Sequence, residues 1–458
     1  MKNENRLDSR ILSILIPAIL ENALLTLSDM ILTGYIGRLT VTEISSFGIA
    51  ERIYGIYFAI FKGFAIGTMV VFAKAYGECN KEKGKRLYLI SLLVALPIAV
   101  LIAALIWLKP EFFLSSMTHQ SKMLAMGSDF LKINALVYPL LAIIHLNSSA
   151  FQADGNTRTP LYIALIGNSV SIVFGYILIL GIGPIQGLGI TGAAITNSIR
   201  ILVMMLVGIW LLFGRNGEFE GIELESIFPI EKKEVKEILR FGLPTAAGNS
   251  FWNFATLFLS GYILTYGQEY YAAYQLGLQG EGFCDMMSAG FLTAAMSLAG
   301  KAIGAGDDTL YRQSYQRLVH FCYIISGITM MFLALFSGAV LHLLTDKETL
   351  ISIAYVYLLV MIFSQYPQHM SKIIYGFIRS SGHSSVPTII DMVGLWGVRV
   401  FLCYLVSSVF HLDILWIWII IDADQWIRYL LSFAFFRIKH VIDYVEIRHR
   451  EECKSCHI

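Results

Sequence analysis

The segment Gln152-Ala-Asp-Gly-Asn-Thr-Arg-Thr-Pro160 has a counterpart 227 residues later, Arg379-Ser-Ser-Gly-His-Ser-Ser-Val-Pro387. In both segments a glycine precedes a proline by the same distance, and the same shift places Pro17 on Pro244. Glycine and proline set the backbone conformation, so matches at these residues concern the fold and not shared apolar composition. The sequence therefore predicts two copies of one structural unit.

The composition indicates a membrane protein. Of the 458 residues, 56% are hydrophobic and 15% are charged, which is too apolar for ordinary soluble domains. Apolar stretches near the length that spans a bilayer predict an all-α integral membrane protein with twelve transmembrane helices in two six-helix lobes. The expected spans are 12–35, 46–73, 87–107, 125–149, 160–182 and 187–213, then 237–263, 271–299, 313–341, 351–376, 387–409 and 414–437.

The polar residues predict domain boundaries and orientation. The charged segment 214–236 reads as a cytoplasmic linker between an N-terminal lobe, 1–213, and a C-terminal lobe with a cytoplasmic tail, 237–458. Lys and Arg gather in the tails and in alternate loops, whereas the opposite loops hold only Arg38, Lys109, Lys122 and Lys347. The positive-inside rule then predicts a multi-pass protein of the cell (inner) membrane with both termini cytoplasmic.

Several function classes receive no support from the sequence. A net charge of +1 gives no basic stripe for nucleic acid, and six scattered cysteines show no disulfide framework. The glycine pattern at 187–192 lies between two membrane-length apolar runs and lacks the acid of a dinucleotide site. Cys453-Lys-Ser-Cys-His457 reads as part of a polar tail and not as haem attachment. We expect no cofactor, no metal site and, without a Walker A pattern, no use of ATP.

Further motifs resemble a known family. Gly304-Ala-Gly-Asp307, Gly192-Ala-Ala194 and Trp396-Gly-Val-Arg399, with the two connectors and the duplication, closely resemble the multidrug and toxic compound extrusion (MATE) family over about residues 10–438. The resemblance implies a non-enzymatic antiporter in which two lobes open a central cavity alternately to each side. It also implies small-molecule amphipathic cations as substrates, extruded against H⁺ or Na⁺, and we expect a monomer in the bilayer.

Asp29 is the first candidate for ion coupling. In the family the first helix carries an acid in a stretch resembling Ser28–Gly34, and Asp29 occupies that position. A charged residue inside a membrane helix costs about 2.5–3.5 kcal/mol on insertion scales, so it persists when it is paired, hydrated or useful. The alternative is a helix-end Asp in the headgroup layer. Glu21 and Glu51 are further coupling candidates, and antiparallel packing of the first two helices predicts a contact between Asp29 and Arg52.

The sequence departs from the family at other acidic positions. One branch places an acid on helix five, where this chain has Ser171 and Gly175. Another branch places acids on helices seven and ten. The corresponding positions in this chain lie near Trp252-Asn253 and near Ser364–Gln368, which contain no acid. A Na⁺ ion needs several oxygen ligands at once, whereas a proton needs one carboxylate. The coupling ion therefore stays open between H⁺ and Na⁺, with H⁺ favoured.

The second lobe has its own acidic pair. Glu281 and Asp285 are four residues apart on helix eight and therefore share a face, with Gln275 and Gln279 close by. These residues predict a substrate or cation site, with a polar contact between helices as the alternative. Amide and hydroxyl side chains on other helices are candidates for lining a polar cavity: Asn22, Asn168, Ser171, Asn249 and Asn253.

Two other functions are compatible with parts of the pattern. A flippase for a lipid-linked precursor would need cationic side chains to meet phosphate, and Lys62 and Arg200 lie in predicted helices. The intramembrane acids weigh against it. An integral-membrane enzyme would need a nucleophile, a base or metal ligands grouped at one depth, and no such group is visible in the sequence.

Overall fold

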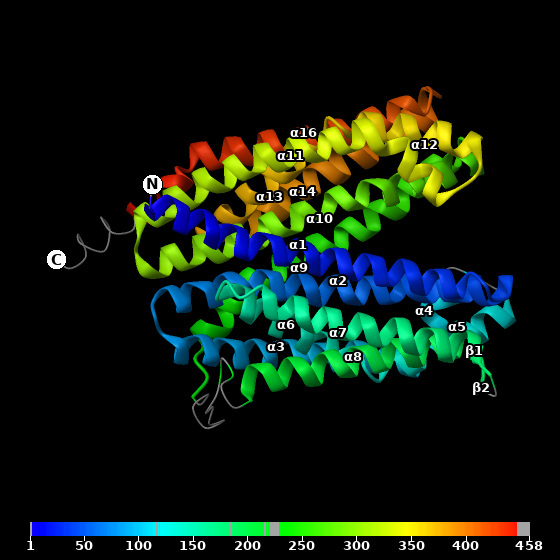
Figure 1. The fold of residues 1–458 in the computed structure, drawn as a ribbon, viewed down its shortest axis with the longest axis horizontal. Helices are drawn as coiled ribbons and strands as arrows, with labels where there is room; N and C mark the ends of the chain where they lie inside the picture. Colours follow the sequence, from blue (N-terminus) through cyan, green and yellow to red (C-terminus); the bar gives the residue numbers. More distant parts are fainter. Residues whose placement is uncertain are drawn as a thin grey trace. The chain divides into compact units, whose positions relative to one another are not determined.

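A computed structural model describes residues 2–115, 118, 120–183, 185–214, 217, 219 and 229–446. Figure 1 shows that nearly all of this chain is helical, with one short hairpin. The predicted linker 214–236 lies partly outside the described residues, and the segment Cys453–His457 lies wholly outside them.

The first half of the chain contributes six membrane-length helices, two of which are interrupted. In chain order its elements are α1 (Lys2–Ile36), α2 (Val41–Gly77), α3 (Lys81–Leu108), α4 (Pro110–Ser115), α5 (Ser121–Ala135), α6 (Tyr138–Ala153), α7 (Arg158–Gly175), η1 (Tyr176–Leu180), β1 (Gly181–Ile182), β2 (Ile185–Gln186) and α8 (Gly189–Phe213). β1 and β2 pair antiparallel, with Gly181 opposite Gln186.

The second half also has six helices of this length, without the hairpin or a counterpart of α4 among the described residues, and with the additional segment η3 in its fifth helix. Its elements are α9 (Lys232–Leu264), α10 (Gln268–Ala305), α11 (Asp308–Leu344), α12 (Glu348–Met361), α13 (Gln365–Ser380), α14 (Ser385–Met392), η3 (Val393–Val400), α15 (Phe401–Tyr404), η4 (Leu405–Val409), α16 (Leu415–Ile438) and η5 (Val441–Asp443). The element order confirms the predicted duplication.

Two spans that were expected to be continuous are bent. The predicted helix 125–149 is the pair α5 and α6, which meet at 50°, and the predicted helix 351–376 is the pair α12 and α13, which meet at 51°. Pro139 and Pro367 lie just beyond the two breaks. Proline lacks the N–H that would continue the preceding helix, which accounts for a bend that apolar composition does not reveal.

Three helical segments are wound more widely than an α-helix. The segments η1 and η4 both end the fifth helix of their half, whereas η3 lies within the fifth helix of the second half only. Wide turns of this kind often occur at functional sites, and η3 contains Arg399, whose contacts are described below.

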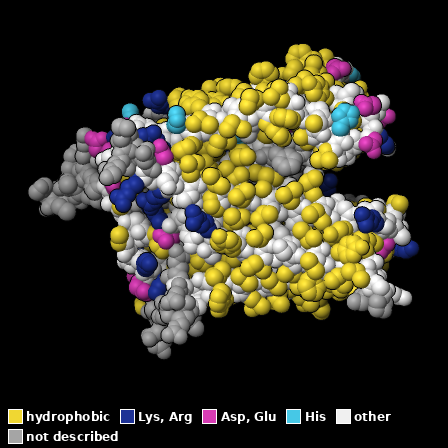
Figure 2. Space-filling view, in the orientation of Figure 1, with side chains coloured by type: hydrophobic (Ala, Val, Ile, Leu, Met, Phe, Trp, Pro, Cys, Tyr) yellow, Lys and Arg dark blue, Asp and Glu magenta, His cyan; other side chains and the backbone are white. Residues whose placement is uncertain are grey.

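The helices meet the expectation for a membrane protein. Eight helices are long and apolar enough to cross a membrane, and the two bent pairs bring the number within the described residues to ten. The remaining two spans are α9 and α16, of 33 and 24 residues, and α16 carries Asp422, Asp424 and Arg428 in its middle. Figure 2 shows hydrophobic side chains covering the lengths of the helices, with Lys and Arg mostly toward the helix ends.

The contacts divide the chain into two compact units. The first-half unit comprises Leu20–Tyr76 and Asn80–Ala246, and the second-half unit comprises Met1–Ile19, Gly77–Cys79 and Ala247–Ile458. The start of α1 belongs to the second-half unit because Ile11 and Leu15 are buried in its hydrophobic core beside Phe291. The functional candidates of each unit are described separately below.

Candidate functional site

Asp29 forms an ion pair within the first-half unit. Arg200 Nη1 on α8 lies 3.1 Å from Asp29 Oδ1 on α1, and Arg200 Nη2 lies 3.5 Å from the phenol oxygen of Tyr54 on α2. The Asp29 side chain is 65% exposed, whereas that of Arg200 is 10% exposed. The carboxylate is therefore anchored from its buried side and open on the other.

The expected contact between Asp29 and Arg52 is wrong. Arg52 is exposed, and Arg200 is the cation that pairs with Asp29. The expectation placed the two residues at similar depth on adjacent helices, but depth does not fix which face of a helix a side chain occupies. Tyr54, two residues further along α2, is on the face directed at this site.

Glu51 lies close to the same pair. It is half-buried on α2 and interacts electrostatically with both Asp29 and Arg200. One guanidinium therefore serves two carboxylates, which leaves the group with one net negative charge when all three are ionised.

Glu21 belongs to a second polar group of the same unit. Gln152 Nε2 on α6 donates a hydrogen bond of 3.0 Å to Glu21 Oε2, and Lys62 on α2 interacts electrostatically with Glu21. The Lys62 ammonium also lies 5.4 Å from the centre of the Phe58 ring. Glu21 and Asp29, both on α1, therefore accept from different side chains, Gln152 and Arg200, while Lys62 interacts electrostatically with both acids.

Buried polar atoms near these helices have no protein partner among the described residues. Both side-chain polar atoms of Asn168 and the hydroxyl of Ser171 on α7 are in this state, although the residues are 3% and 0% exposed. Ser28 on α1 and Tyr138 on α6 carry unpartnered hydroxyls as well. Buried polar groups are normally satisfied, so these positions call for internal water or a bound solute.

The other predicted cavity residues are less informative. Asn22, Asn249 and Asn253 are half-buried, and Asn253 Nδ2 donates to the backbone oxygen of Asn249 on the same helix. This bond keeps the Asn253 amide on its own helix.

The acidic pair of the second-half unit is tied to two other helices. Tyr357 on α12 donates a hydrogen bond of 2.6 Å to Glu281 Oε2 on α10, and the amide of Gln368 on α13 donates to Asp285. Glu281 is buried and Asp285 is exposed. The pair therefore joins α10 to both arms of the bent span α12–α13.

The two glutamines predicted beside this pair occupy different surroundings. Gln275 is half-buried and Gln279 is exposed, both on α10. The amide that contacts the pair is Gln368, which was noted in the sequence only as a position without an acid. No periodicity on one helix could have revealed it.

A larger ion-pair network lies deeper in the second-half unit. Asp424 Oδ2 on α16 accepts from Arg399 at 2.9 Å and from Arg428 at 2.8 Å, and Asp424 is 0% exposed. Arg428 also pairs with Asp391 at 3.2 Å, and Tyr375 donates to the same Asp391 oxygen at 2.9 Å. The network connects α13, α14, η3 and α16.

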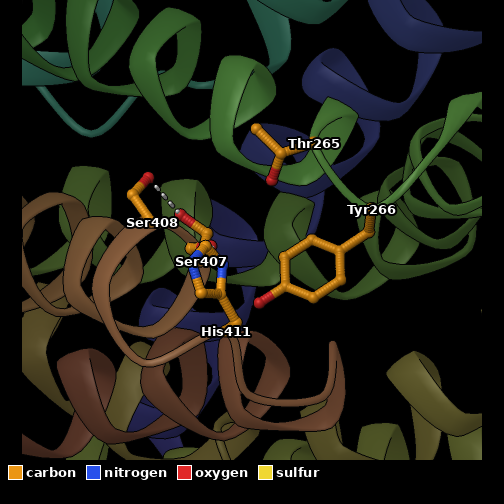
Figure 3. A pocket seen from close by; sticks show the side chains of 5 residues that line it. All are labelled: Thr265, Tyr266, Ser407, Ser408 and His411. Carbon is orange, nitrogen blue, oxygen red and sulfur yellow. Dashed lines mark hydrogen bonds between the residues drawn. The ribbon is translucent and has the colours of Figure 1, made fainter.

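Figure 3 shows a pocket at one end of the second-half unit, between the turn after α9 and the end of η4. Its volume is about 490 Å³, and it is lined by Thr265, Tyr266, Ser407, Ser408 and His411. The Tyr266 hydroxyl donates to the backbone oxygen of Leu412. The lining side chains therefore provide hydroxyl groups, one aromatic ring and one imidazole, and no carboxylate is among them.

Comparison with known proteins gives consistent matches. The family model described as MatE matches residues 17–177 and 244–405, the two copies found in the sequence. The chain is 24% identical over 434 residues to the "Probable multidrug resistance protein NorM" of Thermotoga maritima, covering 93% of this chain and 91% of that protein. It is 23% identical over 426 residues to the "Probable multidrug resistance protein YoeA" of Bacillus subtilis, covering 92% of each.

A solved structure shares the fold. It is described as an outward-facing conformation of a multidrug resistance MATE family transporter of the MOP superfamily. The TM-score is 0.89 at 18% identity, and the match covers 96% of this chain and 97% of that chain.

Proposed function

The chain belongs to the MatE family of membrane transporters, and from this membership we propose that it is a secondary active exporter working by alternating access. We propose that it antiports amphipathic organic cations against H⁺ or Na⁺. Its family places it among transporters and not among enzymes.

The observation that carries this proposal is the Asp29 group. Asp29 is open on one side, and together with Glu51 it exceeds the charge of Arg200, its only ion-pair partner among the described residues. An exposed carboxylate with spare negative charge can bind either a proton or an organic cation. In antiport the carboxylate binds either the proton or the organic cation at one time, because the two must cross the membrane in opposite directions and not together.

The unpartnered polar atoms of Asn168, Ser171, Ser28 and Tyr138 support the same proposal. Water at these positions would connect the interior of the first-half unit to Asp29 and would let protons enter and leave. We therefore assign coupling to Asp29 with Glu51, and we treat Glu21 as a separate polar group joined to α6.

We propose that Glu281 and Asp285 bind the positively charged part of the substrate or a coupling cation. Two acids on one face of α10 accept hydrogen bonds from neutral donors, Tyr357 and Gln368. Lys372 and Arg399 interact with the pair electrostatically, but neither forms an ion pair with it among the described residues. Tyr357, which donates to Glu281, makes an edge contact with Tyr274, and the centres of the two rings lie 5.6 Å apart. Such rings can add cation–π attraction for a flat cation.

Separate Glu281→Gln and Asp285→Asn substitutions are expected to weaken binding of a cationic dye by at least about tenfold each, or about 1.4 kcal/mol. Each change removes one negative charge beside a cation at a site with a low dielectric constant. Fluorescence titration of the purified protein measures the affinity. Glu269→Gln is the matched control, because Glu269 is exposed at the start of the same helix. Unchanged affinity in both variants would assign the pair to structure.

We propose H⁺ as the coupling ion, because the sequence lacks acids at the helix-seven and helix-ten positions on which a Na⁺ site of the family would draw. Purified protein in liposomes is expected to export a cationic dye when only a pH gradient is imposed. The same protein is expected to remain inactive under a Na⁺ gradient with the pH gradient and membrane potential collapsed. Export under that second condition would overturn the assignment and favour Na⁺.

The proposed function also includes an oligomeric state, a membrane and an orientation. We propose a monomer in the cell (inner) membrane, with both termini cytoplasmic because Lys and Arg are concentrated on that side. The lipid-precursor flippase is less well supported, since Arg200 is engaged by Asp29 and Lys62 lies beside Glu21. Neither cation is left uncompensated to meet a phosphate.

A further inference from the structure

We propose that Arg200 is a resident counter-ion, which a transported cation must displace from Asp29 in order to bind. The inference rests on the proposed cation export and adds a positioning residue to it. In this account Arg200 does not contact the substrate. It occupies the carboxylate in the empty state and withdraws toward Glu51 when the cation arrives.

The geometry supports this exchange. Arg200 reaches Asp29 from the buried side, with Nη1 at 3.1 Å from Oδ1, and its other nitrogen reaches Tyr54. The large exposed fraction of Asp29 leaves the opposite side of the carboxylate accessible to a solute. A cation therefore approaches Asp29 without having to pass the guanidinium, and the two positive charges then compete for one carboxylate.

Glu51 makes the exchange electrostatically possible. It interacts with Arg200 and with Asp29, but its carboxylate has no hydrogen bond in the described structure. When a cation takes Asp29, an ionised Glu51 leaves Arg200 a negative partner, so that the guanidinium is not an uncompensated buried charge, which would be costly. Tyr54, on the same helix as Glu51, gives the guanidinium a fixed neighbour in both positions.

The ionised groups around Asp29 and Arg200 carry one more negative than positive charge. The groups on neighbouring helices are Glu21 on α1, Lys62 on α2, and His145 with Tyr138 on α6. Lys62 interacts electrostatically with both Glu21 and Asp29. With all five groups ionised, the carboxylates of Glu21, Asp29 and Glu51 exceed Lys62 and Arg200 by one negative charge. One monovalent cation or one proton neutralises it.

Competition from Arg200 would also weaken cation binding, which helps the exporter to release its substrate. An exporter must release its substrate, and the carboxylates of Asp29 and Glu51 without a counter-ion would retain a cation too strongly. Because displacement of Arg200 is part of every binding event, its cost is subtracted from the affinity of every cation. The residue therefore sets the affinity without selecting the shape of the substrate.

The test is the neutral variant Arg200→Gln, examined by equilibrium binding of tetraphenylphosphonium to the purified full-length protein. We expect the affinity to increase by roughly tenfold, within the usual range of coupling between two charged ligands. We expect Arg200→Lys, which keeps the competing charge, to bind within about threefold of the unaltered protein. A purely structural role for Arg200 would weaken binding in the neutral variant, so the direction of the change separates the two accounts.

Arg52→Gln is the matched control, because it removes a positive charge from the neighbouring exposed position on α2. Equal tightening in Arg52→Gln and Arg200→Gln would overturn the proposal in favour of a general charge effect. Unchanged or weaker binding in Arg200→Gln would overturn it as well. Arg200→Met, which keeps an apolar stem, replaces the Gln variant if that protein does not remain monodisperse.

A separate measurement distinguishes this inference from the proposed function. The unaltered protein in liposomes must export tetraphenylphosphonium when an ion gradient is imposed. Failure of that export contradicts the proposed function itself. Export by the unaltered protein, together with unaltered affinity in Arg200→Gln, contradicts only the role given to Arg200.

Discussion

Replacing Asp29 by Asn is expected to abolish efflux while leaving the protein folded and inserted. Asparagine keeps the shape of the side chain and still accepts a hydrogen bond from Arg200, but it has no charge to exchange between a proton and a cation. Asp29 is the exposed residue among those that contact Arg200, so the substitution removes the negative charge that is most accessible to a solute. Dye uptake into everted membrane vesicles measures the rate, with the amount of protein determined in the same membranes.

Asp129→Asn is the matched control for this experiment. Asp129 is an exposed acid on α5 of the same unit, and the structure gives it no ion pair among the described residues. Its variant is expected to keep the efflux of the unaltered protein. Near-normal efflux in Asp29→Asn would remove Asp29 from the mechanism and return attention to Glu281 and Asp285.

Replacing Asp424 by Asn is expected to have the largest effect on stability. Asp424 is fully buried between Arg399 and Arg428. The substitution removes the only ion-pair partner of Arg399 among the described residues and leaves Arg428 with Asp391 alone. Removing one partner of a buried ion pair typically costs about 3–5 kcal/mol, because the remaining charge stays buried. Thermal unfolding in detergent, followed by tryptophan fluorescence, is expected to show a clearly lower midpoint.

Asp422→Asn provides a strict comparison, because Asp422 lies two residues earlier on α16 and has no ion pair in the described structure. Its midpoint is expected to stay close to that of the unaltered protein. Equal midpoints for the Asp424 and Asp422 variants would show that the network contributes nothing measurable. Gly394 belongs to the same region, since a side chain there would collide with Arg428 and Asp424.

Much of the fold could be predicted from the sequence because its signals are local. Pro17 and Pro244 reveal the duplication, and runs of about twenty apolar residues reveal the helices. The bends before Pro139 and Pro367 were missed because apolar composition continues through them. The wide turns were missed for a similar reason, since their residues remain those of an ordinary apolar helix.

The site was less predictable, since its residues meet across helices. Asp29, Glu281 and Asp285 were identified because a charge inside an apolar span is conspicuous in the sequence. Their partners Arg200, Tyr357 and Gln368 depend on which faces of α8, α12 and α13 are turned toward them. A single sequence contains no information on that rotation. The presence of Arg200 within a predicted helix was the one available signal, and it was interpreted as a possible phosphate ligand.

The shared interruptions of the two halves separate what the repeated unit contains from what one half alone contains. The bends occur at corresponding places in both copies, and η1 and η4 both close the fifth helix of their half. Features present in both copies belong to the repeated unit itself and not to one half alone. The segment η3 occurs in the second half only within the described residues, so the wide winding that contains Arg399, the partner of Asp424, distinguishes that half from the first.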